Sequence, residues 1–262
     1  MGIRRRALGV IPARLASERL PRKPLAELAG RPLLEWVWRR ASTFSVLDAL
    51  VVATDSEEVA AACRRFGAMV ELTRPEHASG TERVAEVASR EPYRDFGIVV
   101  NVQGDEPLLE AEPVELALAL VREGWDVGTA ATPLRNVAEL ADPAVVKVVL
   151  RRDGGALYFS RAAIPHRRAG AAEPIEAGDT RFLRHLGVYV FAREALARWV
   201  ELPPDELEAL ERLEQLRALR AGLSIGVAVV ERAEGGVDTP ADLRRVEERL
   251  RAETLTSTRA GT

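Results

Sequence analysis

One acidic residue of this 262-residue chain stands where a carboxylate could bind a metal ion or orient a substrate. Asp105 follows the apolar, β-branched run Ile98 to Val102, which predicts a buried strand ending in a polar turn with Gly104 and Pro107. In open α/β sheets, ligands bind just beyond the carboxyl ends of the strands. An Asp beside a Gly also commonly closes a turn or caps a helix. This stretch alone leaves both interpretations open.

Basic side chains gather on a loop near the start of the chain. Ala7 to Pro12 predicts a short buried strand, and a helix is expected from about Pro32 to Ser42. The connection between them carries four basic residues within ten positions: Arg14, Arg19, Arg22 and Lys23. Basic side chains between a strand and a helix can bind phosphate groups, although a solvated surface loop has the same composition. Because neither glycine fingerprint for dinucleotides or for a P-loop occurs here, neither of those sites is supported.

A second candidate acid, Asp238, lies just outside a predicted helix start. Thr239 is suited to cap that helix, Pro240 to occupy its first position, and Asp242 to complete a capping box. The helix does not need Asp238, so this carboxylate is available for other chemistry. His77, in contrast, is predicted to be a turn residue, because no partner stands at metal-binding spacing.

The elements that must hold these residues predict an α/β fold, in one domain over residues 1–252. The expected sheet is mostly parallel with helices on both faces, and a smaller mixed insertion lies near residues 130–190. Residues 165–180 are predicted to form a mobile lid and residues 253–262 a flexible tail. Further helices are expected at 56–66, after a cap at Gly80 or Thr81, at 111–122 and at 207–219. Strands are expected at 50–55, 68–72, 126–132, 184–191 and 224–231, with a hairpin over 145–160.

Two of these elements carry candidate binding faces. On the strand 184–191, His185 and Tyr189 share a face, which is consistent with a polar pocket and equally with a half-exposed surface. The leucines of the helix over 207–219 repeat at helical spacing, so that stripe is expected to face the core or a dimer partner.

Composition narrows the class of protein. Hydrophobic content of 47% and no apolar run near the length of a membrane span predict a soluble globular protein. A net charge of −3 gives no reason to expect nucleic-acid binding. The single cysteine, Cys63, cannot form an intrachain disulfide, which fits a cytoplasmic protein. Of the 37 lysine and arginine residues, only Lys23 and Lys147 are lysine. Their scarcity slightly favours a specific need for a compact ammonium group at these two positions.

Taken together, these motifs resemble the 3-deoxy-D-manno-octulosonate (Kdo) cytidylyltransferases. The likeness begins with Ile-Pro-Ala-Arg at Ile11 to Arg14 and with the loop Ser17 to Leu25. That loop alone suggests only a sugar nucleotidyltransferase. Asn-Val-Gln-Gly-Asp-Glu-Pro, from Asn101 to Pro107, and Phe-Leu-Arg-His-Leu-Gly, from Phe182 to Gly187, are far more specific. The resemblance extends over nearly the whole chain.

The resemblance implies that CMP passes from CTP to Kdo, releasing pyrophosphate, with Mg²⁺, in lipopolysaccharide precursor synthesis. It implies a homodimer formed through the insertion and the 207–219 helix. It also implies that Asp105 and Asp238 bind the metal, and it names Asp105, Lys23, Arg14 and Asp238 as catalytic. By the same mapping the nucleotide is bound by Arg14, Ser17, Arg19, Lys23, Ser79, Arg83 and Gln103, and the sugar acid by Gln103, Arg161, His185, Tyr189 and Glu214.

Three residues depart from the family pattern, and they leave the acceptor open. Arg22 replaces a usual Gly, Ala78 a commoner Gln, and His166 a usual aromatic residue. A cytidylyltransferase for 8-amino-Kdo, sialic acid, another ulosonic acid or a phosphonate is therefore an alternative. An inactive nucleotide-sugar sensor is a further alternative, but such a protein has no physical need for two carboxylates beside a phosphate site.

Overall fold

The computed structural model describes residues 5–15, 20–168, 175–176 and 178–260, with the backbone alone over 253–260. Two compact units make up the chain. We call Leu8–Tyr93, Asn101–Leu109 and Glu234–Thr262 the N-terminal unit, and Met1–Ala7, Arg94–Val100 and Glu110–Ala233 the central unit. Each unit is described by itself.

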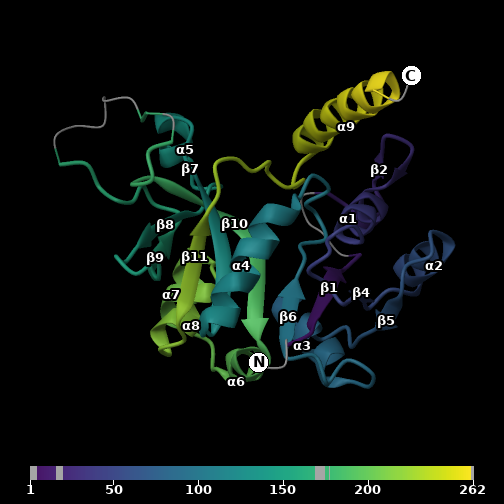
Figure 1. The fold of residues 1–262 in the computed structure, drawn as a ribbon, viewed down its shortest axis with the longest axis horizontal. Helices are drawn as coiled ribbons and strands as arrows, with labels where there is room; N and C mark the ends of the chain where they lie inside the picture. The colour runs from purple at the N-terminus through teal and green to yellow at the C-terminus, as the bar shows by residue number, and fades with distance from the viewer. Residues whose placement is uncertain (1–4, 16–19, 169–174, 177, 261–262) are drawn as a thin grey trace. The chain divides into compact units, whose positions relative to one another are not determined.

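A parallel sheet forms the centre of the N-terminal unit (Figure 1). Strand β1 (Ala7–Ala13) pairs with β4 (Ala49–Thr54), and β4 pairs with β5 (Val70–Leu72), both in parallel. The β-branched and apolar side chains of β1 and β4 are almost entirely buried, as expected for strands covered on both faces. The helices of this unit are α1 (Leu33–Ala41), α2 (Glu57–Arg65), α3 (Gly80–Ser89) and α9 (Pro240–Ala260).

Local capping explains where two of these helices begin. The Ser56 hydroxyl accepts a hydrogen bond from the backbone N–H of Val59, which confirms the predicted start of α2. Helix α3 begins at Gly80 and its cap is Ser79, one residue before the predicted cap, because the Ser79 hydroxyl accepts from the N–H of Glu82. A serine in extended conformation outcompetes the Gly80 or Thr81 predicted for that role.

The loop after β1 has structure that the sequence did not predict. A single 3-10 turn, η1 (Lys23–Leu25), is followed by a small antiparallel hairpin of β2 (Glu27–Leu28) and β3 (Arg31–Pro32). Ala29 and Gly30 both have positive φ, 48° and 78°, the pattern of a two-residue hairpin turn. Trp36 on α1 donates a hydrogen bond to the carbonyl of Leu28 at 2.6 Å and thereby fastens the hairpin to the helix.

Helix α9 continues through Ala260, so residues 253–260 are helical where the sequence analysis expected a tail. The physical reason is visible in the composition, because no Gly or Pro stands between 241 and 260 to stop the helix. At its start, the Asp242 carboxylate accepts hydrogen bonds from the backbone N–H groups of Asp238 and Thr239, as the predicted capping box requires.

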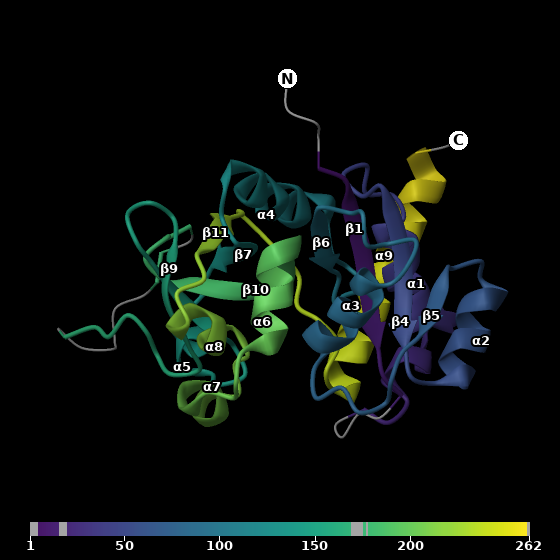
Figure 2. The ribbon, with the colours of Figure 1, turned by 90° about the horizontal axis from the view of Figure 1, so that it is seen from below.

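The central unit contains a mixed sheet (Figure 2). Strand β7 (Val127–Pro133) lies between β11 (Ile225–Val229), which runs parallel to it, and β10 (Leu183–Ala192), which runs antiparallel. The hairpin predicted over 145–160 is confirmed as β8 (Lys147–Leu150) and β9 (Ala156–Ser160), and β8 also pairs with β10.

Helices complete the central unit. α4 (Ala111–Glu123) packs against β7, and Gly128 allows the close approach, since a Cβ there would lie 2.0 Å from the carbonyl oxygen of Ala117. The remaining helices include α5 (Val137–Ala141) and α6 (Arg193–Glu201), and the short strand β6 (Ile98–Asn101) spans the division between the units. The predicted α/β fold class is confirmed, with parallel pairing in one unit and mixed pairing in the other.

The single helix predicted over 207–219 is wrong. The structure has two short helices, α7 (Glu206–Glu211) and α8 (Gln215–Arg220), which are separate in Figure 2. Arg212 between them adopts a left-handed conformation with φ of 52°, which ends α7. The leucine stripe divides with the helix, because Leu213 and Leu216 are buried while Leu210 is 80% exposed.

The predicted lid over residues 165–180 is a segment that the structure describes only in part. Of the predicted lid, residues 169–174 and 177 lie outside the described residues, and Ile175 packs with Leu134 and Phe182 in a small apolar cluster. Across the described ranges, every helix is too short or too polar to cross a lipid bilayer.

Candidate active site

The two candidate acids converge on one lysine. The Lys23 ammonium group lies 2.5 Å from a carboxylate oxygen of Asp105 and 2.9 Å from one of Asp238, although the three residues are far apart in sequence. All three belong to the N-terminal unit. The Asp105 side chain thus belongs to a charged cluster, and its role as a metal or substrate ligand stays a prediction.

Close packing of backbone at the end of β1 places Asp105. The N–H of Val102 donates to the carbonyl of Val10, and Gly104 then passes so close that a Cβ would lie 2.6 Å from the carbonyl oxygen of Pro12. Only glycine tolerates that approach. The chain turns there and presents Asp105 beyond the buried apolar run, as the sequence predicts.

A second backbone contact brings Asp238 to the same place. The N–H of Val237 donates to the carbonyl of Asp105 at 2.8 Å, and Gly236 lies against the Asp105 side chain. The capping box formed by Thr239 and Asp242 then fixes the direction in which the chain enters α9. The predicted location of Asp238, one residue outside this cap, is confirmed.

The cluster holds one positive and two negative side chains. The Lys23 side chain is 13% exposed, whereas Asp105 is 33% and Asp238 47% exposed, so the carboxylates remain accessible. Burial alone would lower the pKa of Lys23, but the ion pairs with Asp105 and Asp238 outweigh that effect and raise it. Lys23 is therefore positively charged at neutral pH, and its ammonium group holds both acids in place.

This arrangement fits Mg²⁺ as far as the protein ligands are concerned. Within the part of the chain that the structure describes, no group of three or more His, Cys, Asp or Glu side chains could hold a metal ion. Mg²⁺ commonly binds through one or two carboxylates, with waters and substrate phosphates completing its shell. Asp105 and Asp238 supply two oxygen donors of that kind beside a cation that could contact the same phosphates.

Of the other predicted phosphate ligands, Arg14 is exposed directly after β1, whereas Ser17 and Arg19 lie outside the described residues. Arg22, which departs from the family pattern, has a φ of 57° and pairs with Glu58. A glycine would adopt that left-handed conformation without strain. The φ value gives a physical reason for the usual glycine, and the ion pair holds the arginine there.

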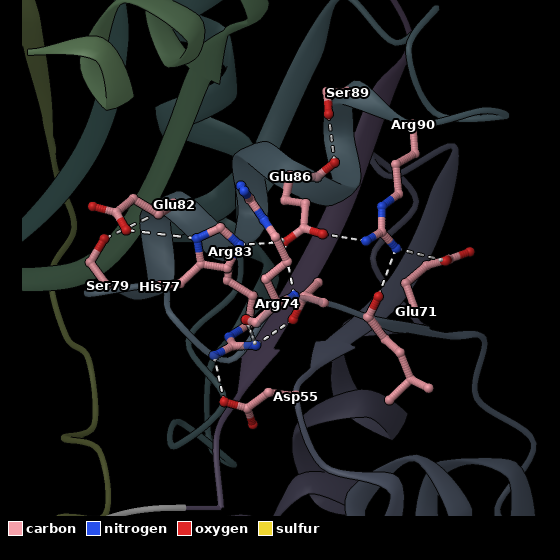
Figure 3. A network of polar contacts seen from close by, with 12 residues as sticks. Asp55, Glu71, Arg74, His77, Ser79, Glu82, Arg83, Glu86, Ser89 and Arg90 are labelled. Atoms are coloured by element: carbon pink, nitrogen blue, oxygen red, sulfur yellow. Dashed lines mark hydrogen bonds and ion pairs between the residues drawn. The ribbon is translucent and has the colours of Figure 1, made fainter.

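The predicted nucleotide residues Ser79 and Arg83 begin helix α3 (Figure 3). Ser79 caps the helix, and Arg83 is buried with its side chain 3% exposed. The Arg83 guanidinium donates to Asp55 at 2.8 Å, to the hydroxyl of Thr73 and to the carbonyl of Arg74 at 3.4 Å. Both residues thus have structural bonds, and their nucleotide roles stay predictions. Gln103, half-buried between Val102 and Gly104, lies in the segment that delivers Asp105.

Apart from Gln103, the predicted sugar residues lie in the central unit, where His185 and Tyr189 are neighbours on β10. Their rings lie 5.4 Å apart between centroids, although the strand has an irregularity between Leu186 and Tyr189. The Thr129 hydroxyl donates to the carbonyl of Val188 at 2.6 Å and lies 2.9 Å from Nε2 of His185. A hydroxyl has one hydrogen to donate, so it accepts from His185, and Nδ1 of that ring carries a lone pair.

Burial controls the charge of both rings. It lowers the pKa of His185 to about 3, so the ring is neutral at physiological pH. Burial, followed by the negative charge of Glu214, raises the pKa of Tyr189 well above its ordinary value. Glu214 stands at the start of α8. His185 and Tyr189 are thus half-buried, uncharged neighbours on β10, and their place in a sugar pocket stays a prediction.

Two residues without a predicted role hold the predicted sugar ligand Arg161. The Glu211 carboxylate accepts from the N–H of Arg161 at 2.9 Å and from the hydroxyl of Ser160 at 2.6 Å. The Lys147 ammonium donates to the carbonyl of Arg161 at 2.6 Å. The scarcity of lysine singled out Lys147, but nothing in the sequence singled out Glu211. The Arg161 guanidinium itself donates to the carbonyls of Glu211 and Pro143.

Fold and charged cluster together define a nucleotidyltransferase-like α/β protein. The family model described as cytidylyltransferase matches residues 8–225. Two solved structures that are only 14–15% identical share the fold alone: a cytidylyltransferase from Leptospira borgpetersenii, with a TM-score of 0.56, and 4-diphosphocytidyl-2C-methyl-D-erythritol synthase, with 0.60.

Curated relatives narrow the family. A 3-deoxy-manno-octulosonate cytidylyltransferase from Gemmatimonas aurantiaca is 51% identical over 239 residues, which cover 91% of this chain and 92% of the relative. One from Syntrophotalea carbinolica is 46% identical and covers 92% and 97%. A solved structure of CMP:2-keto-3-deoxy-manno-octonic acid synthetase with CTP is 38% identical, has a TM-score of 0.86, and covers 95% of this chain and 99% of its own. The chain belongs to the 3-deoxy-manno-octulosonate cytidylyltransferase family, and the predicted family is confirmed.

Proposed function

We propose that this protein transfers CMP from CTP to the anomeric hydroxyl of Kdo, giving CMP-Kdo and pyrophosphate. The observation that carries the proposal is the cluster in which Lys23 lies 2.5 Å from Asp105 and 2.9 Å from Asp238. Such a cluster can bind a triphosphate. The lysine and a metal ion held by the two carboxylates would together neutralise the negative charge of the phosphates. The Gemmatimonas relative is named as a cytidylyltransferase for this sugar acid, and the solved structure that is 38% identical contains CTP.

The proposed reaction is a direct in-line displacement. The anomeric hydroxyl of the acceptor attacks the α-phosphorus of CTP and gives up its proton to water. The bond to pyrophosphate breaks in the same step, without a covalent enzyme intermediate. Lys23 and Arg14 would contact the phosphate oxygens and neutralise charge that develops on the leaving group. Ser17 and Arg19 are proposed to extend this contact, and Ser79, Arg83 and Gln103 to bind the nucleoside.

We also propose Mg²⁺ as the cofactor, held by Asp105 and Asp238. When bound, it would lower the charge of the triphosphate and stabilise the departing pyrophosphate. The role of the protein is then to hold the two carboxylates close to one point. Lys23 does this, because its positive charge lies against both of them.

The sugar acid is proposed to bind in the central unit. Arg161 would pair with its carboxylate through N–H groups other than those that donate to Glu211 and Pro143. His185 is fixed as a neutral ring with a lone pair on Nδ1, and it would accept a hydrogen bond from a sugar hydroxyl. Tyr189 and Glu214 are proposed to contact the remaining hydroxyl groups.

The wider setting follows from the same proposal. CMP-Kdo is a precursor of lipopolysaccharide, so we place the reaction in that synthesis and in the cytoplasm. A single cysteine, Cys63, which is fully buried, supports a reducing compartment. We further propose a homodimer that involves the central unit, for which the exposed side chains of Leu157 and Leu210 are available.

The test is pyrophosphate release with CTP and Mg²⁺ in the presence of Kdo, 8-amino-Kdo or sialic acid, one sugar at a time. The proposal expects turnover with Kdo, with no release in the absence of sugar. Asp105→Ala is expected to abolish it while the protein stays folded. Turnover with 8-amino-Kdo or sialic acid, and none with Kdo, would show that Kdo is not the acceptor. The exposed His166, which departs from the family pattern, would then be the first residue to test. No release with any sugar would contradict the proposed activity.

A further inference from the structure

Helix α3 holds the segment before it through four successive charged side chains (Figure 3). Glu82 accepts from the N–H of Ala78 at 2.9 Å, and Arg90 donates to the carbonyl of Leu72 at 2.7 Å. Between them, Arg83 donates to Thr73 and Arg74, and Glu86 accepts from the N–H of Arg74 at 3.1 Å. Residues 72–79 are therefore fastened to α3 by side chains along much of their length.

His77 contacts α3 with its own side chain, as Thr73 and Arg74 also do. Its ring is 8% exposed, and Nε2 donates a hydrogen bond to the Glu86 carboxylate, which is 11% exposed. Nδ1 lies 3.7 Å from a carboxylate oxygen of Glu82. The His77 ring is therefore placed between two carboxylates of one helix. A buried polar group needs a hydrogen-bond partner, and Glu86 supplies one for Nε2.

Glu86 is the centre of the arrangement. One of its oxygens receives both the His77 ring and the backbone N–H of Arg74, and the other pairs with Arg90. Burial alone would raise the pKa of Glu86, but the hydrogen bond from His77 and those from the Arg74 backbone and Arg90 outweigh it and lower the pKa. The carboxylate is thus ionised at neutral pH and makes charge-assisted hydrogen bonds.

We propose that His77 and Glu86 form a clasp that positions the nucleotide-binding segment, and that His77 is a positioning residue for CTP. The clasp closes the segment that leads directly into Ser79, and Arg83 is tied to Thr73 and Arg74 of the same segment. Release of His77 would let both nucleotide candidates move together. The inference rests on the proposed function, because it assigns the clasp to CTP and not to the acceptor sugar.

The test compares His77→Ala with His77→Gln, whose amide N–H can occupy the place of Nε2–H. His77→Ala is expected to raise the KM for CTP about ten-fold, the effect of losing one hydrogen bond to a charged group, with kcat and the KM for Kdo changed less than two-fold. His77→Gln is expected to restore most of the lost affinity. Glu86→Gln is expected to follow His77→Ala, whereas Glu57→Gln, an exposed glutamate paired with Arg64 on α2, serves as the matched control.

Two measurements without turnover separate this inference from the proposed reaction. Calorimetric titration with CTP is expected to show the same ten-fold loss, and hydrogen exchange is expected to accelerate in peptides over residues 72–79 but not in those over α2. If wild-type protein binds CTP but turns over no sugar, the proposed reaction fails and the clasp is still measured. An unchanged affinity for CTP in folded His77→Ala would overturn the clasp. So would an equal rise of both KM values, or a loss that His77→Gln does not restore.

Discussion

The only two lysines of the chain lie in different units and have opposite surroundings. Lys23, in the N-terminal unit, contacts the carboxylates of Asp105 and Asp238, and its pKa is raised despite its burial. Lys147, in the central unit, is fully buried and donates to the backbone carbonyls of Asp142, Val145 and Arg161. Its burial lowers its pKa.

This difference separates two uses of the same ammonium group. Around Lys23 the acids are accessible and outnumber the cation, so the region can bind further positive charge and phosphate. Around Lys147, each of the three N–H groups of the ammonium donates to a carbonyl oxygen. All of its hydrogen bonds are thus made to the backbone, and its role is structural. The N-terminal unit holds Asp105 and Asp238 by charge, and the central unit holds His185 and Tyr189 as neutral, half-buried groups.

The largest effect is expected from removing charge at the accessible cluster. Asp105→Asn keeps the shape of the side chain but removes one carboxylate, so kcat is expected to fall about a thousand-fold while the fold is retained. Pyrophosphate release and circular dichroism check the two parts. Glu57→Gln, the same chemical change on an exposed helix, is expected to leave kcat within two-fold. Activity of Asp105→Asn near that of the wild type would show that the cluster is structural.

Matched substitution of the two lysines tests the comparison itself. Lys147→Met leaves buried carbonyls without a donor, so the free energy of unfolding is expected to fall by about 2–4 kcal/mol. Lys23→Met leaves two partly exposed acids, so stability is expected to change by less than about 1 kcal/mol while activity falls at least about a hundred-fold.

Urea unfolding measures the free energy of unfolding of each variant, and pyrophosphate release measures its activity. A loss of stability that is equal for the two lysines would contradict the distinction drawn here. So would a Lys147→Met protein that is stable but inactive, because it would give the buried lysine a chemical role.

The neutral state of His185 predicts how acid affects the central unit. Since burial lowers its folded pKa to about 3, below the ordinary value of 6.5, the unfolded chain binds this proton more readily. The stabilising contribution is therefore present above about pH 6.5 and is lost as pH falls toward 3, by up to about 1.4 kcal/mol per pH unit. His185→Gln is expected to flatten this part of the stability curve, measured by urea unfolding between pH 4 and 7. An unchanged slope would show that His185 is charged in the folded protein.

The location of the candidate site could be predicted from sequence because its signals are local. The apolar run before Asp105 and the capping box after Asp238 both identify the ends of elements, and the structure confirms both. The contact of these acids with Lys23 could not be predicted from spacing. It depends on the close approach of Gly104 to Pro12 and on the hydrogen bond from Val237, which are tertiary contacts.

Two of the errors in the predicted fold have a common cause. The break between α7 and α8 and the turn before η1 are both made by arginines with positive φ, Arg212 at 52° and Arg22 at 57°. Sequence patterns predict such conformations at Gly, Asn or Asp, so an arginine gives no signal. The leucine spacing over 207–219 is helical on both sides of Arg212, and the periodicity therefore predicted one helix where there are two.

These two arginines provide the finest test of the comparison, because each unit contains one left-handed arginine at the edge of a helical turn. At either position Gly is expected to be more stable than Ala by about 1 kcal/mol, since Ala retains the strain of positive φ and both lack the guanidinium. Glu58→Ala measures separately what the ion pair of Arg22 contributes. The pairs should differ in function: the KM for CTP is expected to respond to the Arg22 substitutions, because η1 carries Lys23, and not to those of Arg212. If substitution of Arg212 also changed the KM for CTP, the proposed assignment of CTP binding to the N-terminal unit alone would be contradicted.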